Sequence, residues 1–486
     1  MNYKMIFYIL GYVLLFEALF MLVPLGIAIY QGEISSIFAF IIITAITFVL
    51  SLLLIRKKPV KKAIYAKEGF IIVGLAWILI SFLGSFPFYI SGTIPSFIDA
   101  FFEAVSGFTT TGVTTLSNID ALPVSMIFWR SFTNWIGGMG VLVFILAIIS
   151  LAGGNAVHLM RAESPGPSPG KLVPKIGHTA KILYSIYLGL TVIQIILLLA
   201  GGMPLFDSIV NAFSTAGTGG FSINNNSIAH YDSAYLQGVI TTFMIIFGVT
   251  FNFYYFIIIK KLSQALRYEE VWVYLIIIGS AMALVTMNIY GVIYQGWGES
   301  FRYASFQVAS VITSTGFSTA DFATWPQFSQ ITLLFLMFVG GCAGSTAGGI
   351  KVIRLLLLFK AARLEMDKLI HPRAVQSLHL NGKPVDPLTI RGIRSYMVAY
   401  ILIVVITTLV VSLDGFDFTT TFSAIACTIN NVGVGLGAIG PSGSFADFSI
   451  LSKIMFIFNM LAGRLEIFPI WIMLMPGVWK GIRNAS

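Results

Sequence analysis

The chain has 486 residues, of which 57% are hydrophobic and only 10% are charged. Soluble globular domains carry about 25% charged residues, so this composition excludes an ordinary soluble protein and indicates an integral membrane protein. The net charge of +9 does not call for a nucleic-acid partner, because cytoplasmic loops rich in Lys and Arg make many membrane proteins basic. The two cysteines, Cys342 and Cys427, lie in apolar or small-residue stretches and are expected to be free buried thiols.

The apolar segments predict a chain that crosses the membrane many times. A spanning helix needs roughly 20 mostly apolar residues. We predict ten such helices, at residues 6–30, 36–55, 69–91, 124–150, 181–201, 235–259, 271–294, 331–359, 391–413 and 449–475. The first is too long for a secretory signal and lacks a small-residue cleavage site, so we expect it to remain in the protein.

The distribution of Lys and Arg predicts how these segments are oriented. With Lys4 included, 25 of the 29 Lys and Arg lie in the even-numbered connections or the C-terminal tail, and the exceptions are Arg130, Arg302, Lys453 and Arg464. The side rich in Lys and Arg is cytoplasmic. Both termini are therefore predicted to be cytoplasmic, and the odd-numbered connections to face outward.

One short unit occurs four times in the outward-facing connections. Aligned on a single glycine, the copies are DAFFEAVSGFTTTGVT ending at Thr114, DSIVNAFSTAGTGGFS ending at Ser222, YASFQVASVITSTGFS ending at Ser318 and TTFSAIACTINNVGVG ending at Gly435. We call the shared glycines the anchor glycines; they are Gly112, Gly220, Gly316 and Gly433. The residue two positions before the anchor is polar in every copy. Such self-similarity indicates four copies of one structural unit.

The apolar part of each copy is too short to span a membrane. Non-helical backbone at membrane depth survives only when it is buried in protein or lines a cavity, so each copy is predicted to be a re-entrant half-helix and turn between two spanning helices. All four enter from the same side, and parallel repeats are related by an axis along the membrane normal. We predict an all-α integral membrane protein with four parallel helix–pore-loop–helix repeats around a pseudo-fourfold pore. A two-helix addition at 1–60 precedes repeats at 61–165, 166–268, 269–378 and 379–486.

The four turns carry the chemistry of a site for a monovalent cation. Each half-helix points its C-terminal end, with partial negative charge, into the membrane, and glycine lets backbone carbonyls face the axis without an intervening Cβ. A ring of carbonyls replaces the water shell of a cation, and hydroxyls stand beside it on Thr110, Thr111, Thr218, Ser314 and Thr315. The turns contain no Asp or Glu, which argues against a divalent ion. The alternative is four packed glycine turns that hold no ion.

These features resemble the membrane subunit of a bacterial Trk-type potassium uptake system, in the Trk/Ktr/HKT superfamily. The resemblance covers the whole chain and rests on the anchor glycines, on NNVGVGLGAIGP at 430–441 and on ESPGP at 163–167. The helix pair at 6–55 and the fourth-repeat motif resemble the TrkH branch more than the shorter Ktr branch. The resemblance implies a homodimer in the bacterial inner (plasma) membrane, in contact with lipid, with K⁺ as the transported ion and no covalent cofactor. It also implies a cytosolic, nucleotide-binding, TrkA-like gating ring, so that nucleotide would act only through this partner.

The resemblance also bears on ion preference. In this superfamily glycine at all four anchors goes with K⁺, and serine at the first goes with Na⁺, so Gly112 predicts K⁺ over Na⁺. Only one glycine per turn is shared, so we expect Rb⁺ to pass and Na⁺ to be partly excluded. The residues assigned to the selectivity filter, and to the K⁺ site within it, are Thr110, Thr111, Gly112, Val113, Thr218, Gly219, Gly220, Phe221, Ser314, Thr315, Gly316, Phe317, Asn431, Val432, Gly433 and Val434.

A glycine-rich stretch, GGCAGSTAGG at 340–349, interrupts the eighth predicted helix. A helix that begins at Ile331 reaches it after about 13 Å, near the middle of the membrane. Its density of Gly and Ala breaks a helix, and the alternative is a small-residue seam for helix packing. The resemblance implies an intramembrane loop that obstructs the pore below the filter. The residues assigned to this gate are Gly340, Gly341, Gly344, Ser345, Thr346, Gly348 and Gly349.

The second candidate for the gate is Arg464, deep in the last predicted helix. Glu466 does not share its helix face, so this Arg is expected to face a cavity or a partner on another helix. The resemblance implies a pore-facing cation that impedes permeation, and the alternative is a buried structural ion pair. Arg130 and Lys453 lie near the outer ends of their segments, where interfacial snorkelling is expected. Glu17, in the first segment, has no evident partner.

The charged loop at 360–394 is predicted to dock the gating ring, and a solvated loop near anionic lipid is the alternative.

Other functions are less well supported by the sequence. Converging Ser, His and Asp residues or metal-ligand spacings are missing from the sequence, so we do not expect an enzyme. The remaining alternative is a Na⁺- or H⁺-coupled K⁺ symporter with the same filter. The shortage of acids in the predicted spans counts against H⁺ coupling.

Overall fold

The structure is a computed structural model that describes residues 1–56, 58–59, 65–140, 176–372 and 376–479. Its helices are α1 (Tyr3–Gln31), α2 (Ile34–Ile55), α3 (Ala66–Ile90), α4 (Phe97–Phe108), α5 (Val124–Gly138), α8 (Ile176–Ala200), α9 (Leu205–Gly217), α10 (Ala234–Phe247), α11 (Phe251–Ile258), α12 (Leu262–Ala265), α13 (Glu269–Ile289), α14 (Trp297–Ile312), α15 (Gln327–Val339), α16 (Val352–Ile370), α17 (Pro387–Val411), α18 (Phe418–Ile429), α19 (Ile450–Arg464), α20 (Phe468–Leu474) and α21 (Pro476–Trp479). The connections contain the 3₁₀ turns η2 (Ser227–His230), η3 (Phe322–Thr324), η4 (Ser412–Asp414) and η5 (Gly437–Ile439), and the antiparallel pair β1 (His379–Leu380) and β2 (Lys383–Pro384).

Six of the ten predicted spanning helices are continuous in the structure. They are α1, α2, α3, α8, α13 and α17, and each is long and apolar enough to cross a membrane. The other four predictions fall on the second helix of each repeat, where the structure differs. A continuous helix was wrong for α10 and α11, which meet at a 92° bend, and for α19 and α20, whereas the break between α15 and α16 falls at the glycine-rich stretch that was predicted to interrupt the eighth helix. α5 ends at Gly138, and the rest of the predicted helix at 124–150 lies outside the described residues from residue 141 onward.

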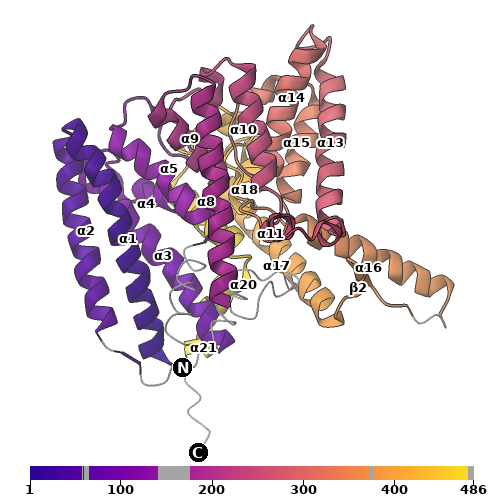
Figure 1. Ribbon diagram of the computed structural model, residues 1–486, viewed down its shortest axis with the longest axis horizontal. Coiled ribbons are helices and arrows are strands. Elements are labelled where there is room, and N and C mark those ends of the chain that lie inside the picture. The colour runs from indigo at the N-terminus through magenta and orange to yellow at the C-terminus, as the bar shows by residue number, and fades with distance from the viewer. Residues whose placement is uncertain (57, 60–64, 141–175, 373–375, 480–486) are drawn as a thin grey trace, which may run out of the picture.

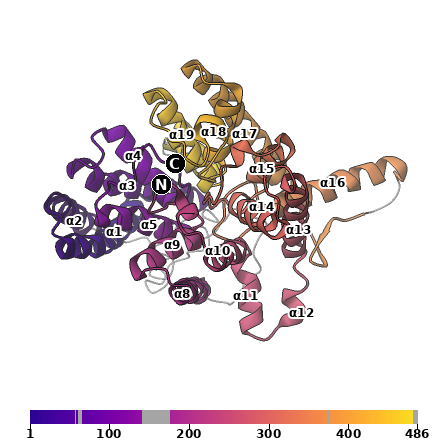
Figure 2. The same cartoon turned by 90° about the horizontal axis from the view of Figure 1, so that it is seen from above.

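The short helices α4, α9, α14 and α18 are the four re-entrant half-helices that the sequence predicted. Each follows a long helix and ends in the turn that carries an anchor glycine. In Figure 2 the repeats follow one another around a common centre, from purple α4 through magenta α9 and red α14 to orange-yellow α18. The second helix of each repeat packs against the half-helix of the next: α5 against α9, α10 against α14, α15 against α18 and α19 against α4. The last of these contacts closes the circle, which gives the predicted pseudo-fourfold arrangement.

The remaining elements lie around this centre. The first two helices stand at one edge, where α1 packs against α2, α3 and α5 (Figure 1). Both views show α16 projecting away from the bundle. α21 and the N-terminus lie at the same end of the molecule (Figure 1).

Candidate functional site

The four turns share one backbone conformation. The residue two positions before each anchor has a positive φ, at 54° for Thr110, 54° for Thr218, 56° for Ser314 and 54° for Asn431. The anchors also have positive φ, between 65° at Gly220 and 91° at Gly433. Left-handed backbone costs a residue with a Cβ roughly 1–2 kcal/mol, so four matching instances at aligned positions mark a conformation that the surrounding structure imposes. The sequence alignment thus corresponds to a real structural repeat.

The anchor glycines bring the turns into a closed ring. A Cβ at any anchor would overlap a backbone carbonyl oxygen of the next turn. The pairs are Gly112 with the oxygen of Gly219, Gly220 with that of Thr315, Gly316 with that of Val432, and Gly433 with that of Thr111. We call these four oxygens, from Thr111, Gly219, Thr315 and Val432, the carbonyl ring. Each lies one residue before its own anchor and against the anchor of a neighbouring turn, so glycine is required at all four positions.

Hydrogen bonds hold the first and third turns in the same way. Ser106 Oγ donates to Val113 O at 2.6 Å, and Ser310 Oγ donates to Phe317 O at 2.6 Å. The hydroxyls of Thr109 and Thr111 lie 2.8 Å apart, as do those of Thr313 and Thr315. The fourth turn differs, because Asn431 Nδ2 donates to Thr111 Oγ1 at 2.8 Å and so links the fourth turn to the first. These bonds use side-chain groups and leave the carbonyl ring to backbone oxygens.

A cavity of about 200 Å³ opens on one side of the ring. It is lined by all four anchor glycines and by residues that follow them, including Thr114, Ser222 and Ser318. None of the described residues lining this outer cavity is an Asp or Glu. The ligands it offers beside the ring are therefore uncharged oxygens, which suit a weakly charged monovalent cation rather than a divalent one.

Arg130 is part of the wall of the outer cavity, and the snorkelling that the sequence predicted for it is wrong. It is only 1% exposed, and its Nε lies 2.7 Å from Glu103 Oε1. Its guanidinium also stacks over Phe221, 4.2 Å from the ring centre. Glu103 in turn accepts from Thr114 Oγ1 at 2.9 Å, just after the first anchor. The ion pair of Arg130 and Glu103 therefore helps to hold the first turn in place.

The snorkelling predicted for Lys453 is also wrong. It is 7% exposed, and its Nζ lies 2.8 Å from Asp99 Oδ1 on α4. Its partner is on a helix from another repeat, so the pair ties α19 to the first half-helix.

We expect Arg130→Met to lower the thermal unfolding midpoint of the detergent-purified protein. Removing one member of a buried ion pair leaves an uncompensated charge and costs about 3–5 kcal/mol of stability. The double variant Glu103→Gln with Arg130→Met removes both charges and should recover much of the loss. A single variant as stable as the original protein would contradict the structural role given to this pair.

The glycine-rich stretch at 340–349 is a loop, as the sequence predicted, and its residues do not form a helical seam. Gly340, Gly344 and Gly349 have positive φ. The loop is held from several directions: Cys342 N donates to Gly248 O at 2.9 Å, and Ala343 N donates to Glu270 Oε1 at 2.6 Å. Backbone of this kind at membrane depth is stable only because protein groups satisfy its hydrogen bonds.

The loop lies directly against the turns, on the side away from the outer cavity. Gly348 N donates to Ser314 Oγ at 2.5 Å, and Gly349 N donates to Asn430 O at 3.1 Å. Both partners precede the carbonyl ring in their turns, whereas the outer cavity is lined by residues at and after the anchors. The loop therefore covers the side of the ring that faces away from the outer cavity.

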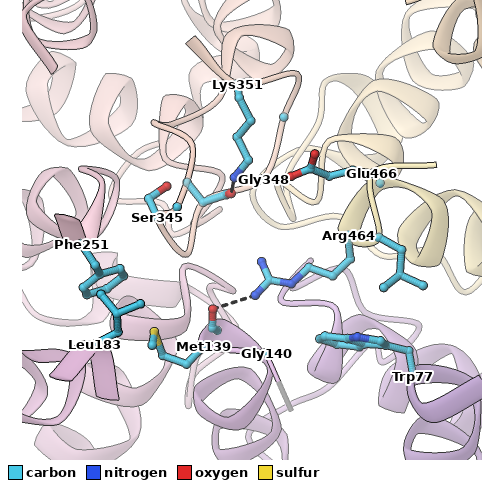
Figure 3. A pocket seen from close by; sticks show the side chains of 16 residues that line it. Trp77, Met139, Gly140, Leu183, Phe251, Ser345, Gly348, Lys351, Arg464 and Glu466 are labelled. Carbon is cyan, nitrogen blue, oxygen red and sulfur yellow. Dashed lines mark hydrogen bonds between the residues drawn. The ribbon is translucent and has the colours of Figure 1, made fainter. Parts of the chain in front are cut away.

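Arg464 connects this loop to the first repeat (Figure 3). Its Nη1 donates to Thr346 O at 2.8 Å, and its Nη2 donates to Gly138 O at 2.8 Å and to Gly137 O. The side chain lines a cavity of about 130 Å³ on the inner side of the loop. Glu466, two residues further along, does not share the helix face of Arg464, as predicted, and pairs with Arg354.

A second cation in the same cavity was missed by the sequence reasoning. Lys351 lines the cavity with Arg464, and its Nζ donates to Ala347 O of the loop. Its backbone has φ of 79°, immediately before α16 begins. Its position directly after a predicted helix break was the available signal. Two cationic side chains thus donate to adjacent carbonyls of the loop, Arg464 to Thr346 O and Lys351 to Ala347 O.

All sixteen predicted filter residues lie in the four turns, and the seven predicted loop residues and Arg464 lie together beneath them. The ESPGP motif at 163–167 lies outside the described residues. Cys342 and Cys427 are free and buried, as expected. No cluster of three His, Cys, Asp or Glu side chains suited to a metal ion occurs among the described residues.

Comparison with known proteins gives one consistent result. The model of the TrkH family, described as cation transport protein, matches residues 33–477. The Trk system potassium uptake protein TrkH of Salmonella typhimurium is 37% identical over 424 residues, covering 86% of this chain and 87% of the relative. TrkG of Escherichia coli K12 is 34% identical over 483 residues, covering 98% and 99%. The crystal structure of the potassium transporter TrkH from Vibrio parahaemolyticus superimposes with a TM-score of 0.88 at 33% identity, over 99% of this chain and 100% of that one. The chain therefore belongs to the TrkH family of cation transport proteins.

Proposed function

We propose that this chain is the membrane subunit of a bacterial potassium uptake system and that it conducts K⁺ passively through the carbonyl ring. The observation that carries this proposal is the closed circle of contacts between anchor glycines and carbonyl oxygens. Four backbone oxygens around one axis replace the hydration shell of a monovalent cation. The names of the Salmonella, Escherichia and Vibrio relatives all specify potassium. Rb⁺ passes by the same route, and Na⁺ is partly excluded.

The loop at 340–349 is the proposed gate. It touches two of the four turns on the inner side, and Arg464 and Lys351 hold it across a cavity through which the ion must leave. Two cationic side chains beside this route oppose the passage of a cation. Opening then requires the loop to leave the turns, which breaks these hydrogen bonds.

Uptake of ⁸⁶Rb⁺ into K⁺-loaded liposomes that contain the purified protein tests the proposal. No Na⁺ or H⁺ gradient is applied. We expect uptake that external K⁺ inhibits at much lower concentration than Na⁺ does. Uptake that begins only when a Na⁺ or H⁺ gradient is imposed would replace the passive channel with a coupled symporter.

Removing residues 343–347 from the loop is expected to raise passive ⁸⁶Rb⁺ uptake several-fold at equal amounts of protein. The deletion removes the bond from Ala343 to Glu270 and the carbonyls that Arg464 and Lys351 hold. A matched control removes residues 291–293, which are exposed in the turn between α13 and α14. Unchanged uptake in a correctly folded loop variant would remove the loop as a gate.

The regulatory partner proposed for this subunit is a cytosolic, nucleotide-binding ring, which docks on the projecting helix α16 and the segment that follows it. α16 carries exposed charged residues, among them Lys368 and Glu365, and it projects from the bundle at a distance from the turns (Figure 1). Exposed apolar side chains on α16, such as Phe359 and Leu369, support its use in contacts with other chains, including a second copy in a homodimer. Both termini lie on the cytoplasmic side of the bacterial inner membrane in this proposal. Co-purification with the ring protein tests it, and we expect Leu369→Glu to reduce recovery of the ring.

A further inference from the structure

Glu17 is a buried carboxylate that the ion pathway does not use. It lies halfway along α1, is 4% exposed, and neither carboxylate oxygen has a hydrogen-bond partner among the described residues. It lines a cavity of about 290 Å³ between α1, α3, α4, α5 and α8. Burying a carboxylate without a partner is costly, and acids within membrane spans are usually functional. The cavity therefore contains a strong hydrogen-bond acceptor, and the described residues around it donate no hydrogen bond to it.

The walls of this cavity are aromatic. Its lining includes Phe16, Phe20, Phe108, Trp135, Tyr184 and Tyr187. The polar atoms of the last three are already engaged: Trp135 Nε1 bonds Thr191, Tyr184 bonds Gly140 O, and Tyr187 bonds Trp135 O at 2.8 Å. The N–H and O–H groups of these three rings are therefore already used, and a ligand in the cavity would contact mainly the faces of the rings. No Lys or Arg occurs among the described residues that line it.

We propose that this cavity binds a small organic ammonium ion that carries an aromatic or alkyl group. Aromatic faces attract an ammonium group through cation–π interactions. A primary ammonium also donates charge-assisted hydrogen bonds, which the Glu17 oxygens lack. The apolar part of the ligand then covers the remaining wall, including Ile80, Ile136 and Leu188. The pairing of an unpartnered acid with an aromatic enclosure selects this ligand chemistry.

Other occupants fit these observations less well. A buried water needs two to four polar partners, and apart from Glu17 the lining offers mainly Ser185 and aromatic groups that are already hydrogen-bonded. A lipid tail would leave the carboxylate unsatisfied, and a lipid headgroup belongs at the interface rather than halfway along a spanning helix. A bare K⁺ ion would find one carboxylate where it needs a shell of oxygens.

The test uses saturable binding of radiolabelled 2-phenylethylammonium to the purified full-length protein in detergent, measured by equilibrium dialysis. We expect Glu17→Gln to weaken binding at least about tenfold, because it removes the charge-assisted bonds. Leu188→Trp keeps the acid but fills the cavity from a side chain that is 52% exposed, and we expect it to abolish binding by occupying the space. The matched control, Glu299→Gln, changes an exposed acid outside the cavity and should bind as the original protein does.

Absence of saturable binding, or equal binding by the original protein and the Glu17→Gln variant, would overturn the proposal. The measurement involves no ion flux, so its failure would leave the proposed K⁺ conduction untouched. Conversely, a protein that binds the amine but fails to conduct would retain this site and lose the proposed function.

Discussion

Replacing Gly112 by serine is expected to reduce the preference for K⁺ over Na⁺ by at least about tenfold. A Cβ at this position overlaps the carbonyl oxygen of Gly219, and the backbone has φ of 82°, which a residue with a side chain adopts at a cost of roughly 1–2 kcal/mol. The first and second turns must therefore move apart, and one of the four oxygens leaves its place around the ion. Since about 1.4 kcal/mol changes a binding ratio tenfold, loss of one carbonyl ligand is sufficient for this effect.

The readout is the concentration of K⁺ and of Na⁺ that halves ⁸⁶Rb⁺ uptake into liposomes. Gly92→Ser is the matched control, because Gly92 has φ of 75° and a Cβ placed there would meet no described atom within 4 Å. It introduces the same backbone strain in the same repeat without touching the ring. An unchanged ratio of the two concentrations in Gly112→Ser would show that the ring does not select the ion.

Replacing Arg464 by alanine is expected to raise passive Rb⁺ uptake at least about tenfold. At about 6 Å and an effective dielectric constant of ~20, a fixed positive charge opposes a passing cation by roughly 3 kcal/mol. The same side chain also holds the loop through Thr346 O and the end of α5 through Gly138 O. Its removal therefore takes away both an electrostatic barrier and a link that keeps the loop in place.

Arg464→Lys separates these two effects. Lysine keeps the positive charge, but it lacks the planar guanidinium group whose two terminal nitrogens bond the loop and the end of α5 at the same time. Low uptake in the lysine variant and high uptake in the alanine variant would assign the barrier to charge, and high uptake in both would assign it to the held loop. Arg302→Ala, which removes a cation paired with the exposed Asp232, is the control for loss of positive charge elsewhere. Uptake by Arg464→Ala that does not rise, in protein that folds, would contradict the role given to this residue.

The repeat was predictable from sequence because each turn needs glycine at one place. Aligning Gly112, Gly220, Gly316 and Gly433 was enough to find the four half-helices and their order around the axis. The left-handed residues before them were not predictable as a set, because only Asn431 is of a type enriched at positive φ, whereas Thr110, Thr218 and Ser314 are not.

The breaks between α10 and α11 and between α19 and α20, and the ion pairs, were harder to foresee, for a different reason. Apolar composition predicts that a segment lies in the membrane, and it does not report whether neighbouring protein satisfies a broken backbone. The 92° bend between α10 and α11 lies at such a place, where Gly248 O accepts from Cys342 N of the loop. The pairs of Arg130 with Glu103 and of Lys453 with Asp99 join separate helices. Arg130 and Lys453 lie near the outer ends of their predicted helices, and this position suggested that they reach the membrane interface. Their actual partners depend on how separate helices pack together, which the sequence does not show.

The central claim is that an ion binds at the carbonyl ring, and anomalous X-ray diffraction from crystals soaked in Rb⁺ tests it most directly. The account predicts an anomalous peak on the pseudo-fourfold axis, coordinated by the backbone oxygens of Thr111, Gly219, Thr315 and Val432, that added K⁺ displaces far more readily than Na⁺. A ring without such a peak, or a peak that K⁺ and Na⁺ displace equally, would contradict it.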